Sequence, residues 1–253
     1  MSNHVVKSRE ETCKLIKSWI GKKRIIVSRY SDGEANIFRG RKKVDLSCGN
    51  EDSSIIRDLL LRSIKDDRQL VCINELKKSN IKNNDRWVKV QKELVDTGGH
   101  LSYGGANWNT FDFQNDNEIL PTLLSGSVLI VTGHADEAKK AFDSKGIEID
   151  FYKTSLKAAS VNYGKYLNNL KKIVGEYDNV LFCCGPIGKV LLVDLIDECE
   201  GNLVDLGCLI NAIIDSILYS DRRTIKSWNM SWANTADIYK CVDKLLSKIQ
   251  ITG

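Results

Sequence analysis

Proline and histidine are scarce in this chain, which has two prolines and three histidines among 253 residues. No stretch rich in proline or serine marks a linker and no internal repeat is present, so one domain spanning 1–253 is expected. The eight cysteines include no Cys-x-x-Cys pair and no Cys/His cluster with the spacing of zinc ligands. This excludes a structural zinc module, and the cysteines inside apolar runs fit core thiols in a reducing compartment.

Long apolar runs and blocks of like charge are also absent. No run of about 18 apolar residues could span a membrane, and the polar start of the chain, 1–9, does not resemble a signal peptide. The net charge of +4 is mild and no five like charges are contiguous, which argues against a nucleic-acid partner. We expect a cytoplasmic protein with at most peripheral membrane contact through the basic stretch 39–43, for which the alternative is a solvated face. No feature indicates an oligomeric state.

Several common motifs are missing as well. No Gly-x-Gly-x-x-Gly follows a predicted strand and no Gly-x-x-x-x-Gly-Lys-[Ser/Thr] occurs, so neither a dinucleotide fingerprint nor a P-loop is present. The chain has no Gly-x-Ser-x-Gly elbow and no His-Glu-x-x-His, which argues against a serine hydrolase and a zinc protease.

What the chain does have is a regular alternation of short apolar runs and segments with helical spacing. The predicted strands are 24–28, 69–73, 127–131, 147–152, 179–184 and 202–206, and the predicted helices are 8–20, 35–38, 52–64, 84–95, 135–142, 161–174, 188–199 and 209–219. This alternation requires crossover connections and gives a parallel sheet covered on both faces. The predicted fold class is therefore α/β: a single doubly wound Rossmann-like domain with a mostly parallel sheet. Its core covers about 24–219, and a C-terminal helix over 235–249 packs on it.

The first predicted strand is followed by a turn that contains two carboxylates, Arg29-Tyr30-Ser31-Asp32-Gly33-Glu34. In extended backbone the side chains of residues i and i+2 leave the same face, so Asp32 and Glu34 are expected to point at one small volume. Gly33 lets a ligand come close, and two carboxylates suit Mg²⁺ or Mn²⁺, which in turn binds phosphate oxygens. Arg29 suits a phosphate or one of these carboxylates. The alternative is a common Asp-Gly turn with a solvated ion pair.

A second turn, at 184–189, lies between a predicted strand and a predicted helix. Its residues Gly185, Pro186, Gly188 and Lys189 offer free N–H groups, a helix dipole and an ammonium, which together suit an anion. The alternative is a tight turn that only packing requires.

Three further residues are candidates for catalysis. Asp205 ends a predicted strand, where it can bind a sugar or ribose hydroxyl or a metal-bound water, and Asn211 in the next helical turn can reach the same pocket. His134 follows the strand at 127–131, where it can act as a base or hydrogen-bond donor, or only cap a helix. Ligands of doubly wound sheets bind beyond the carboxyl ends of the strands, where these residues are expected.

The segment 100–117 is rich in glycine, asparagine and aromatic residues and has no clean period. Such a composition is typical of a functional loop over a site. The alternative is a surface loop held in place by Trp108, Phe111 and Phe113.

Together these motifs resemble those of the GT-D-type glycosyltransferases. Members carry Arg-[Phe/Tyr]-x-Asp-Gly-Glu after the first strand, a turn of the type Gly-Pro-x-Ala-x-x-Leu-x-x-Asp-Leu, and then Asp-x-Gly at a strand end. This chain matches the three patterns at 29–34, 185–195 and 205–207, so the resemblance spans most of residues 24–215.

The resemblance implies a Rossmann-like domain in which Asp32 and Glu34 bind Mn²⁺ or Mg²⁺, and this cation binds the diphosphate of a UDP-sugar. The implied reaction is metal-dependent transfer of a hexose from a nucleotide diphosphate sugar to a hydroxyl of a glycan or lipid-linked glycan. Arg29 and the turn at 185–189 would neutralise further phosphate charge. Asp205 or His134 would orient or deprotonate the acceptor, and the aromatic segment 100–113 would close over the donor.

Two departures from the family pattern affect the base and the sugar rather than the metal pair. Cys208 and Asn211 stand where many members have a histidine or serine and then an acidic residue, and Lys157-Ala158 stands where relatives have a lysine-asparagine pair. The rival interpretations are another nucleotide- or SAM-dependent transferase of Rossmann type and a non-catalytic nucleotide- or sugar-binding module. Such a module has no need of both acidic residues of the pair.

Overall fold

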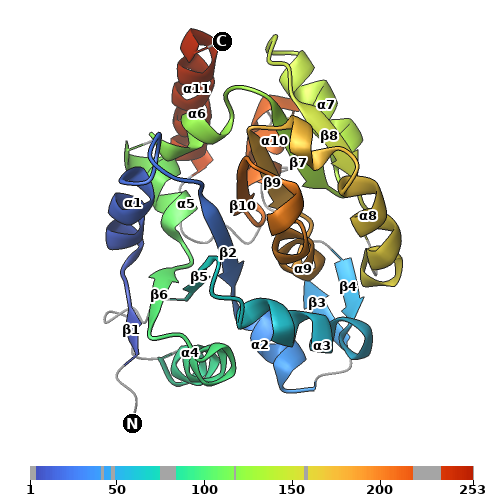
Figure 1. Ribbon diagram of the computed structural model, residues 1–253. Coiled ribbons are helices and arrows are strands. Elements are labelled where there is room, and N and C mark those ends of the chain that lie inside the picture. The colour runs from blue at the N-terminus through green and yellow to red at the C-terminus, as the bar shows by residue number, and fades with distance from the viewer. Residues whose placement is uncertain are drawn as a thin grey trace.

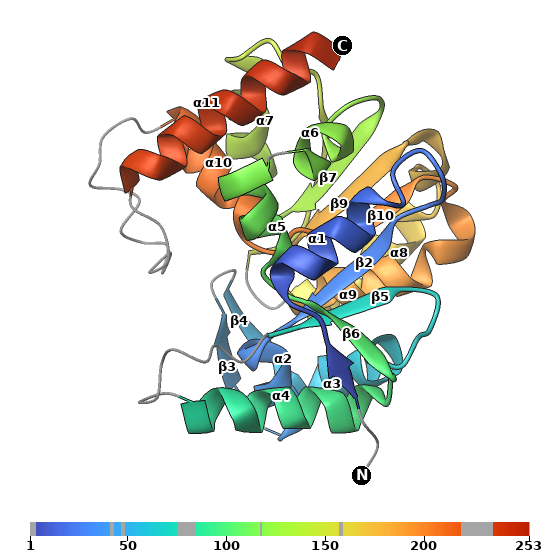
Figure 2. The same cartoon turned by 90° about the vertical axis from the view of Figure 1, so that its left-hand side faces the viewer.

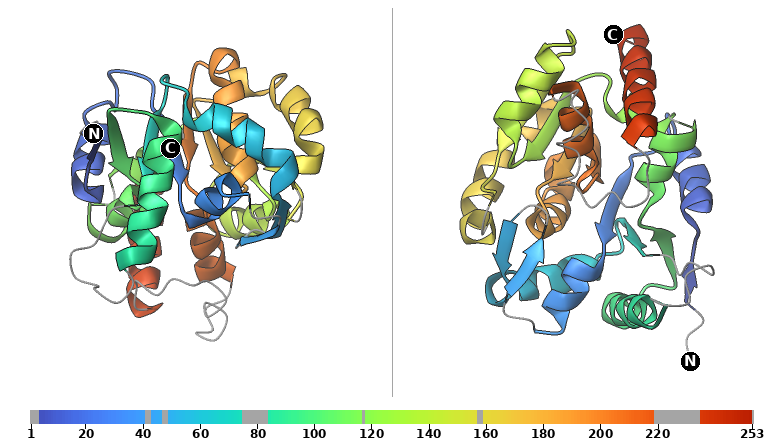
Figure 3. Two further views of the ribbon diagram at one scale, coloured as in Figure 1. Left: turned by 90° about the horizontal axis from the view of Figure 1, so that it is seen from below. Right: turned by 180° about the vertical axis from the view of Figure 1, so that it is seen from behind.

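A computed structural model describes residues 4–40, 43–46, 49–74, 84–116, 118–156, 159–218 and 235–252. Its centre is an eight-stranded sheet in the order β1-β6-β5-β2-β10-β9-β7-β8, in which every pairing is parallel (Figure 1). The strands are β1 (Val5–Val6), β2 (Ile26–Tyr30), β5 (Leu70–Ile73), β6 (Ser102–Gly105), β7 (Val128–Thr132), β8 (Asp150–Lys153), β9 (Asn179–Cys183) and β10 (Asn202–Asp205). A separate antiparallel hairpin, β3 (Lys43–Leu46) and β4 (Gly49–Asp52), lies beside the sheet (Figure 3).

Helices cover both faces of the sheet (Figure 2). One face packs against α1 (Arg9–Lys17), α5 (Trp108–Phe111), α6 (Ile119–Leu123), α7 (Ala135–Asp143), α10 (Leu209–Leu218) and α11 (Thr235–Thr252). The other face packs against α2 (Asp32–Phe38), α3 (Ser53–Ile64), α4 (Asn84–Gly98), α8 (Tyr163–Leu170) and α9 (Pro186–Asp194). The strands read as continuous apolar runs because alternate residues enter two different cores: Val204 packs in one and Leu203 in the other.

The chain leaves adjacent strands β2 and β10 in opposite directions. After β2 it continues into α2 and α3 on one face and returns to the sheet as β5, whereas after β10 it continues into α10 on the other face. The strands are in register, with Val204 opposite Val27 and Asp205 opposite Phe182, so the ends of β2, β10 and β9 meet at one edge. Divergent connections of this kind leave a crevice at the carboxyl edge of the sheet.

The predicted fold class is confirmed: the chain is a single doubly wound α/β domain, and its main sheet is entirely parallel. The first strand lies two residues later than predicted, over 26–30, and α2 begins at Asp32 instead of residue 35. The C-terminal helix lies at 235–252. No helix in the described ranges is long and apolar enough to cross a membrane. Parts of the basic stretch 39–43 and the pair at 157–158 lie outside the described residues.

The segment 100–117 is not the loop predicted from its composition. It forms strand β6, helix α5 and a π-helical turn over 112–116. Trp108 and Phe113 are buried in the core, and Tyr103 packs in the core of the opposite face. These aromatic rings stabilise the fold, so the expectation that the aromatic segment 100–113 is a loop that closes over the donor was wrong, whereas Trp108 and Phe113 do hold the segment in place.

Candidate functional site

A cavity of about 270 Å³ lies beyond the carboxyl ends of β2, β10 and β9. Three sequence segments that are far apart in the chain converge on it, and the end of β6 adds one residue. It is lined by Arg29, Ser31, Asp32, Gly33, Glu34, Ala106, Cys183, Gly185, Pro186, Lys189, Asp205, Gly207, Cys208 and Asn211. The structure thus places together nine of the eleven residues that the sequence predicted for the site, but not His134 or Gly188.

The two acidic residues of the first turn are not on extended backbone, so the geometry predicted for them was wrong. Ser31 is the N-cap of α2, and Asp32 and Glu34 belong to the first helical turn. The carboxylate of Glu34 folds back so that its Oε2 accepts a hydrogen bond from the Ser31 N–H at 2.8 Å. This is half of a capping box, which the sequence pattern Ser-x-x-Glu also encodes. Both side chains still line the cavity, Glu34 buried and Asp32 half-buried.

Lys189 occupies the centre of the charged part of the cavity. Its Nζ lies 2.9 Å from Oδ2 of Asp205 and 3.2 Å from Oε1 of Glu34, and all three side chains are buried. Burial alone would lower the pKa of Lys189, but the carboxylates of Asp205 and Glu34 outweigh it and raise the pKa above its ordinary value. The ammonium therefore stays charged at neutral pH and is already paired with two anions. This differs from the free phosphate-binding cation that the sequence suggested.

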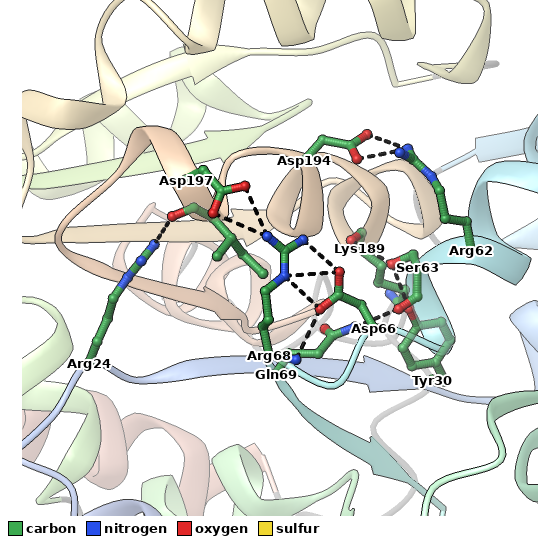
Figure 4. Close-up of polar contacts among 11 residues, drawn as sticks. Arg24, Tyr30, Arg62, Ser63, Asp66, Arg68, Gln69, Lys189, Asp194 and Asp197 are labelled. Carbon is green, nitrogen blue, oxygen red and sulfur yellow. Dashed lines mark hydrogen bonds and ion pairs between the residues drawn. The ribbon is translucent and has the colours of Figure 1, made fainter.

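Contacts from α3 fix the backbone around Lys189 (Figure 4). The Ser63 hydroxyl donates to the Lys189 carbonyl oxygen at 2.9 Å, and the Tyr30 hydroxyl lies 2.8 Å from the same Ser63 oxygen. Burial raises the pKa of Tyr30, so its hydroxyl keeps the proton that it donates. At the C-terminal end of α9, Arg62 pairs with Asp194 at 2.7 Å. Helix α9 is thus held by α3 at two points, Lys189 near its middle and Asp194 at its end.

Asp205 has partners at both carboxylate oxygens. Oδ1 accepts a hydrogen bond from the Gly207 N–H at 2.8 Å, and Oδ2 accepts one from the Arg29 N–H at 3.2 Å in addition to the Lys189 contact. A carboxylate held by two amides and an ammonium is fixed in orientation. This arrangement suits a residue that organises the cavity between β2 and β10.

Arg29 lines the cavity, and two backbone carbonyl oxygens hold its guanidinium. Its Nε donates to the Ala106 carbonyl oxygen and its NH1 donates to the Leu206 carbonyl oxygen at 3.0 Å. Gly207 has a φ of +58°, and a Cβ at this position would collide with NH1 of Arg29. The guanidinium thus brings fixed positive charge to the site while it bridges the ends of β6 and β10.

The second turn, at 184–189, contributes more backbone than side chains to the site. Gly185 is the N-cap of α9 with a φ of 69°, which favours glycine. Pro186 is the first residue of the helix, so the helix begins two residues before the predicted start at 188. Gly188 is buried instead against β9, where a Cβ would lie 3.2 Å from that of Phe182, so its small size serves packing. His134 is the N-cap residue of α7 at the end of β7, two strands away from β10.

Sequence reasoning did not select Ser31, Ala106, Cys183, Gly207 or Cys208 as site residues, although each lines the cavity. Ala106 could not be found because the strand before it, β6, was not predicted. The pairing of Lys189 did have a sequence signal. It is the one charged residue in the apolar stretch 186–193, and a buried lysine requires an anionic partner.

The cavity carries three carboxylates and two cationic side chains, a net formal charge of −1. In the described ranges, no cluster of three or more His, Cys, Asp or Glu side chains is placed to hold a metal ion. A cation at Asp32 and Glu34 would take its other ligands from substrate phosphates and water, a common arrangement for Mg²⁺ and Mn²⁺. Asp32 and Glu34 both line the cavity and would hold such a cation through carboxylate oxygens, so the donor set fits a cation held in this way.

Neither a family model nor a curated protein matches the chain. Solved structures do match. A structure of the domain of unknown function 1792 is 21% identical with a TM-score of 0.63, covering 81% of this chain and 79% of that chain. A second, described as showing that this domain has a distinct glycosyltransferase fold, is 20% identical with the same TM-score and coverage. A third, described as a new glycosyltransferase of this kind from Streptococcus sanguinis, is 17% identical with a TM-score of 0.61, covering 81% of each chain. The chain therefore has the fold of the domain of unknown function 1792, which confirms the resemblance of its motifs at the level of the fold.

Proposed function

We propose that the chain is a metal-dependent glycosyltransferase. It would move a hexose from a nucleotide diphosphate sugar, such as a UDP-sugar, to a hydroxyl of a glycan or lipid-linked glycan. The observation that supports this proposal is the convergence of the segments 29–34, 185–189 and 205–211 on one cavity at the carboxyl edge of the sheet. The fold is shared with structures described as glycosyltransferases.

The charge of the cavity supports a role for a divalent cation. A diphosphate is an anion, and a cavity with a net formal charge of −1 repels it unless a cation is added. We propose that Asp32 and Glu34 hold Mn²⁺ or Mg²⁺, which when bound stabilises the negative charge of the leaving diphosphate. The fixed guanidinium of Arg29 and the N-terminus of α9 at Gly185 add positive potential to the same volume.

The acceptor side is proposed to depend on Asp205. Of the two residues considered for the acceptor hydroxyl, Asp205 lines the cavity and His134 does not. Both oxygens of Asp205 already accept hydrogen bonds, so we propose that it orients groups in the cavity. Lys189 keeps Asp205 and Glu34 in place, which makes its contribution to donor binding indirect.

The proposal is tested by thermal unfolding with UDP, GDP, ADP and their common sugar derivatives, each with and without Mn²⁺. A ligand at about 100 times its Kd adds roughly 2.7 kcal/mol, and for a domain of this size the Tm rises by roughly 5–10 °C. We expect a shift that requires Mn²⁺ and disappears in Asp32→Asn. The matched control is Asp143→Asn, an exposed residue at the end of α7, which should retain the shift.

Three other outcomes would change the interpretation. A panel without any shift contradicts the donor site. A shift that is indifferent to metal favours a nucleotide-binding module or another Rossmann-type transferase. The third outcome is binding that requires metal but is not followed by turnover. If the nucleoside diphosphate is not released from the nucleotide sugar even slowly, with or without glycan acceptors, the non-catalytic module is favoured.

A further inference from the structure

The cavity contains one polar atom that lacks a partner. Asn211 lies in the first turn of α10 and lines the cavity, and only 4% of its surface is exposed. Its Oδ1 is one of five buried side-chain N or O atoms without a hydrogen-bond partner in the described residues, and it alone belongs to a residue that lines this cavity. A buried acceptor left unpaired destabilises the fold. A residue that bears this cost next to a cavity is placed to meet a donor that the chain itself does not supply.

The segment that carries Asn211 adds only uncharged residues to the cavity after Asp205. After Asp205, the β10–α10 segment lines the cavity with Gly207, Cys208 and Asn211, and β9 adds Cys183. Burial raises the pKa of the Cys183 thiol, so this side chain stays neutral. The β2–α2 segment on the adjacent strand carries the acidic pair at 32 and 34 instead. With the proposed cation at the acidic pair, a ligand with an anionic part and an uncharged part rich in hydroxyls would match this division.

We infer that Oδ1 of Asn211 accepts a hydrogen bond from a hydroxyl of the transferred sugar. The inference rests on the proposed function, which supplies the diphosphate near Asp32 and Glu34 and the hexose attached to it. An amide is not basic, so Asn211 recognises the sugar and does not act as a proton acceptor in the reaction. A site built around such an acceptor discriminates against a sugar that lacks the matching hydroxyl, because the buried oxygen is then left unpaired.

The nucleoside offers donors too, namely the ribose hydroxyls and the base. A nucleoside diphosphate and its sugar derivative share these groups and differ in the sugar. The affinity ratio between UDP-glucose and UDP therefore isolates the contact to the sugar from any contact to the nucleoside. UDP-galactose and UDP-N-acetylglucosamine extend the comparison to other hydroxyl patterns.

The test variant is Asn211→Leu, which removes the acceptor and keeps a side chain of similar size that favours a helix. The matched control is Asn169→Leu, an exposed residue of α8 whose amide reaches Tyr152. Binding is measured by calorimetry in Mn²⁺. We expect Asn211→Leu to bind UDP as the unmodified chain does and to bind the preferred UDP-sugar roughly 5- to 150-fold more weakly, the range for one unpaired buried group.

A second measurement separates recognition from a structural role. Without ligand, Asn211→Leu should have a Tm equal to or above that of the unmodified chain, because it removes an unpaired buried oxygen. A lower Tm with an unchanged affinity ratio would show a structural asparagine and overturn the inference. Equal weakening of UDP and UDP-sugar would show that Asn211 contacts the nucleoside and would overturn it as well. If the unmodified chain binds none of the nucleotides and nucleotide sugars in the thermal unfolding panel, the proposed donor site fails and the inference fails with it. That outcome is distinct from an altered affinity ratio in the variant.

Discussion

Replacement of Lys189 by methionine tests the charge arrangement on which the site depends. Methionine has similar length and no charge, so it fills most of the volume and removes the ammonium. Glu34, 5% exposed, and Asp205, 1% exposed, then remain buried without the cation that lies 3.2 and 2.9 Å from them. Removal of one partner from a buried ion pair costs about 3–5 kcal/mol, because the remaining charge is uncompensated. We therefore expect Lys189→Met to lose stability by this amount.

Thermal unfolding measures the loss directly. For a domain of this size each kcal/mol corresponds to about 2–4 °C, so the Tm should fall by roughly 6–20 °C. The control is Lys139→Met, which removes a lysine whose ion pair with Asp143 joins side chains that are 65% and 53% exposed. Exposed pairs of this kind contribute less than about 1 kcal/mol. If the two variants lose similar stability, the buried Lys189 network is not what stabilises this edge of the sheet.

The pH dependence of the free energy of unfolding, compared between the unmodified chain and Lys189→Met, gives an independent check. The raised pKa of Lys189 means that the folded chain holds its proton to higher pH than the unfolded chain, in which the lysine has its ordinary value near 10.4. This stabilisation is complete below about pH 10.4 and is lost as the pH rises through the folded pKa. In EDTA, the free energy of unfolding of the unmodified chain should therefore fall more steeply above about pH 10.4 than that of Lys189→Met. The slopes should differ by up to about 1.4 kcal/mol per pH unit, and parallel curves would contradict the assignment.

Two further substitutions test local contacts, one at the cavity and one at the start of α6, by urea unfolding. Gly207→Ala forces a side chain onto a φ of +58° and into Arg29. It should therefore lower the free energy of unfolding more than Gly146→Ala, where φ is +68° but no atom lies within 4 Å of the added Cβ. Equal losses would mean that the Arg29 contact adds nothing to backbone strain. Asp112→Leu removes a buried carboxylate that accepts three backbone N–H groups at 3.0–3.1 Å around the start of α6, and should cost about 1–3 kcal/mol. A change below 0.5 kcal/mol would show that water satisfies these groups.

The fold was predictable where the sequence pattern and the burial agree. Strands β7, β9 and β10 lie inside a sheet covered on both faces, so they appear as apolar runs that composition alone reveals. Strand β6, with the sequence Ser-Tyr-Gly-Gly, has no such run. Its identity comes from contacts with the rest of the fold: a Cβ at Gly105 would lie 2.7 Å from the backbone nitrogen of Arg9, and one at Gly104 would collide with Cys72. Close approach between segments selects these glycines, and local propensity cannot show it.

Most residues of the site could be predicted from the sequence, but their orientation could not. The reason is that the sequence of the first turn fits two different backbone conformations. The residues Ser31-Asp32-Gly33-Glu34 fit an acidic turn on extended backbone and equally fit a helix N-terminus, because Ser-x-x-Glu is a capping box. In the helix, two residues at i and i+2 are separated by about 200° around the axis. Glu34 therefore points inward to Lys189, while Asp32 stays half-buried at the cavity.

The consequence is that the two acidic residues are chemically unequal. Asp32 is the more exposed of the pair, whereas both oxygens of Glu34 already have partners in the protein, the Ser31 N–H and the Lys189 ammonium. A cation that uses both must share Glu34 with an ammonium 3.2 Å away, and the repulsion between the two positive charges weakens that bond relative to the one from Asp32. On the proposed function, an anionic diphosphate would relieve this repulsion. Cation and donor would then bind together more tightly than either does alone.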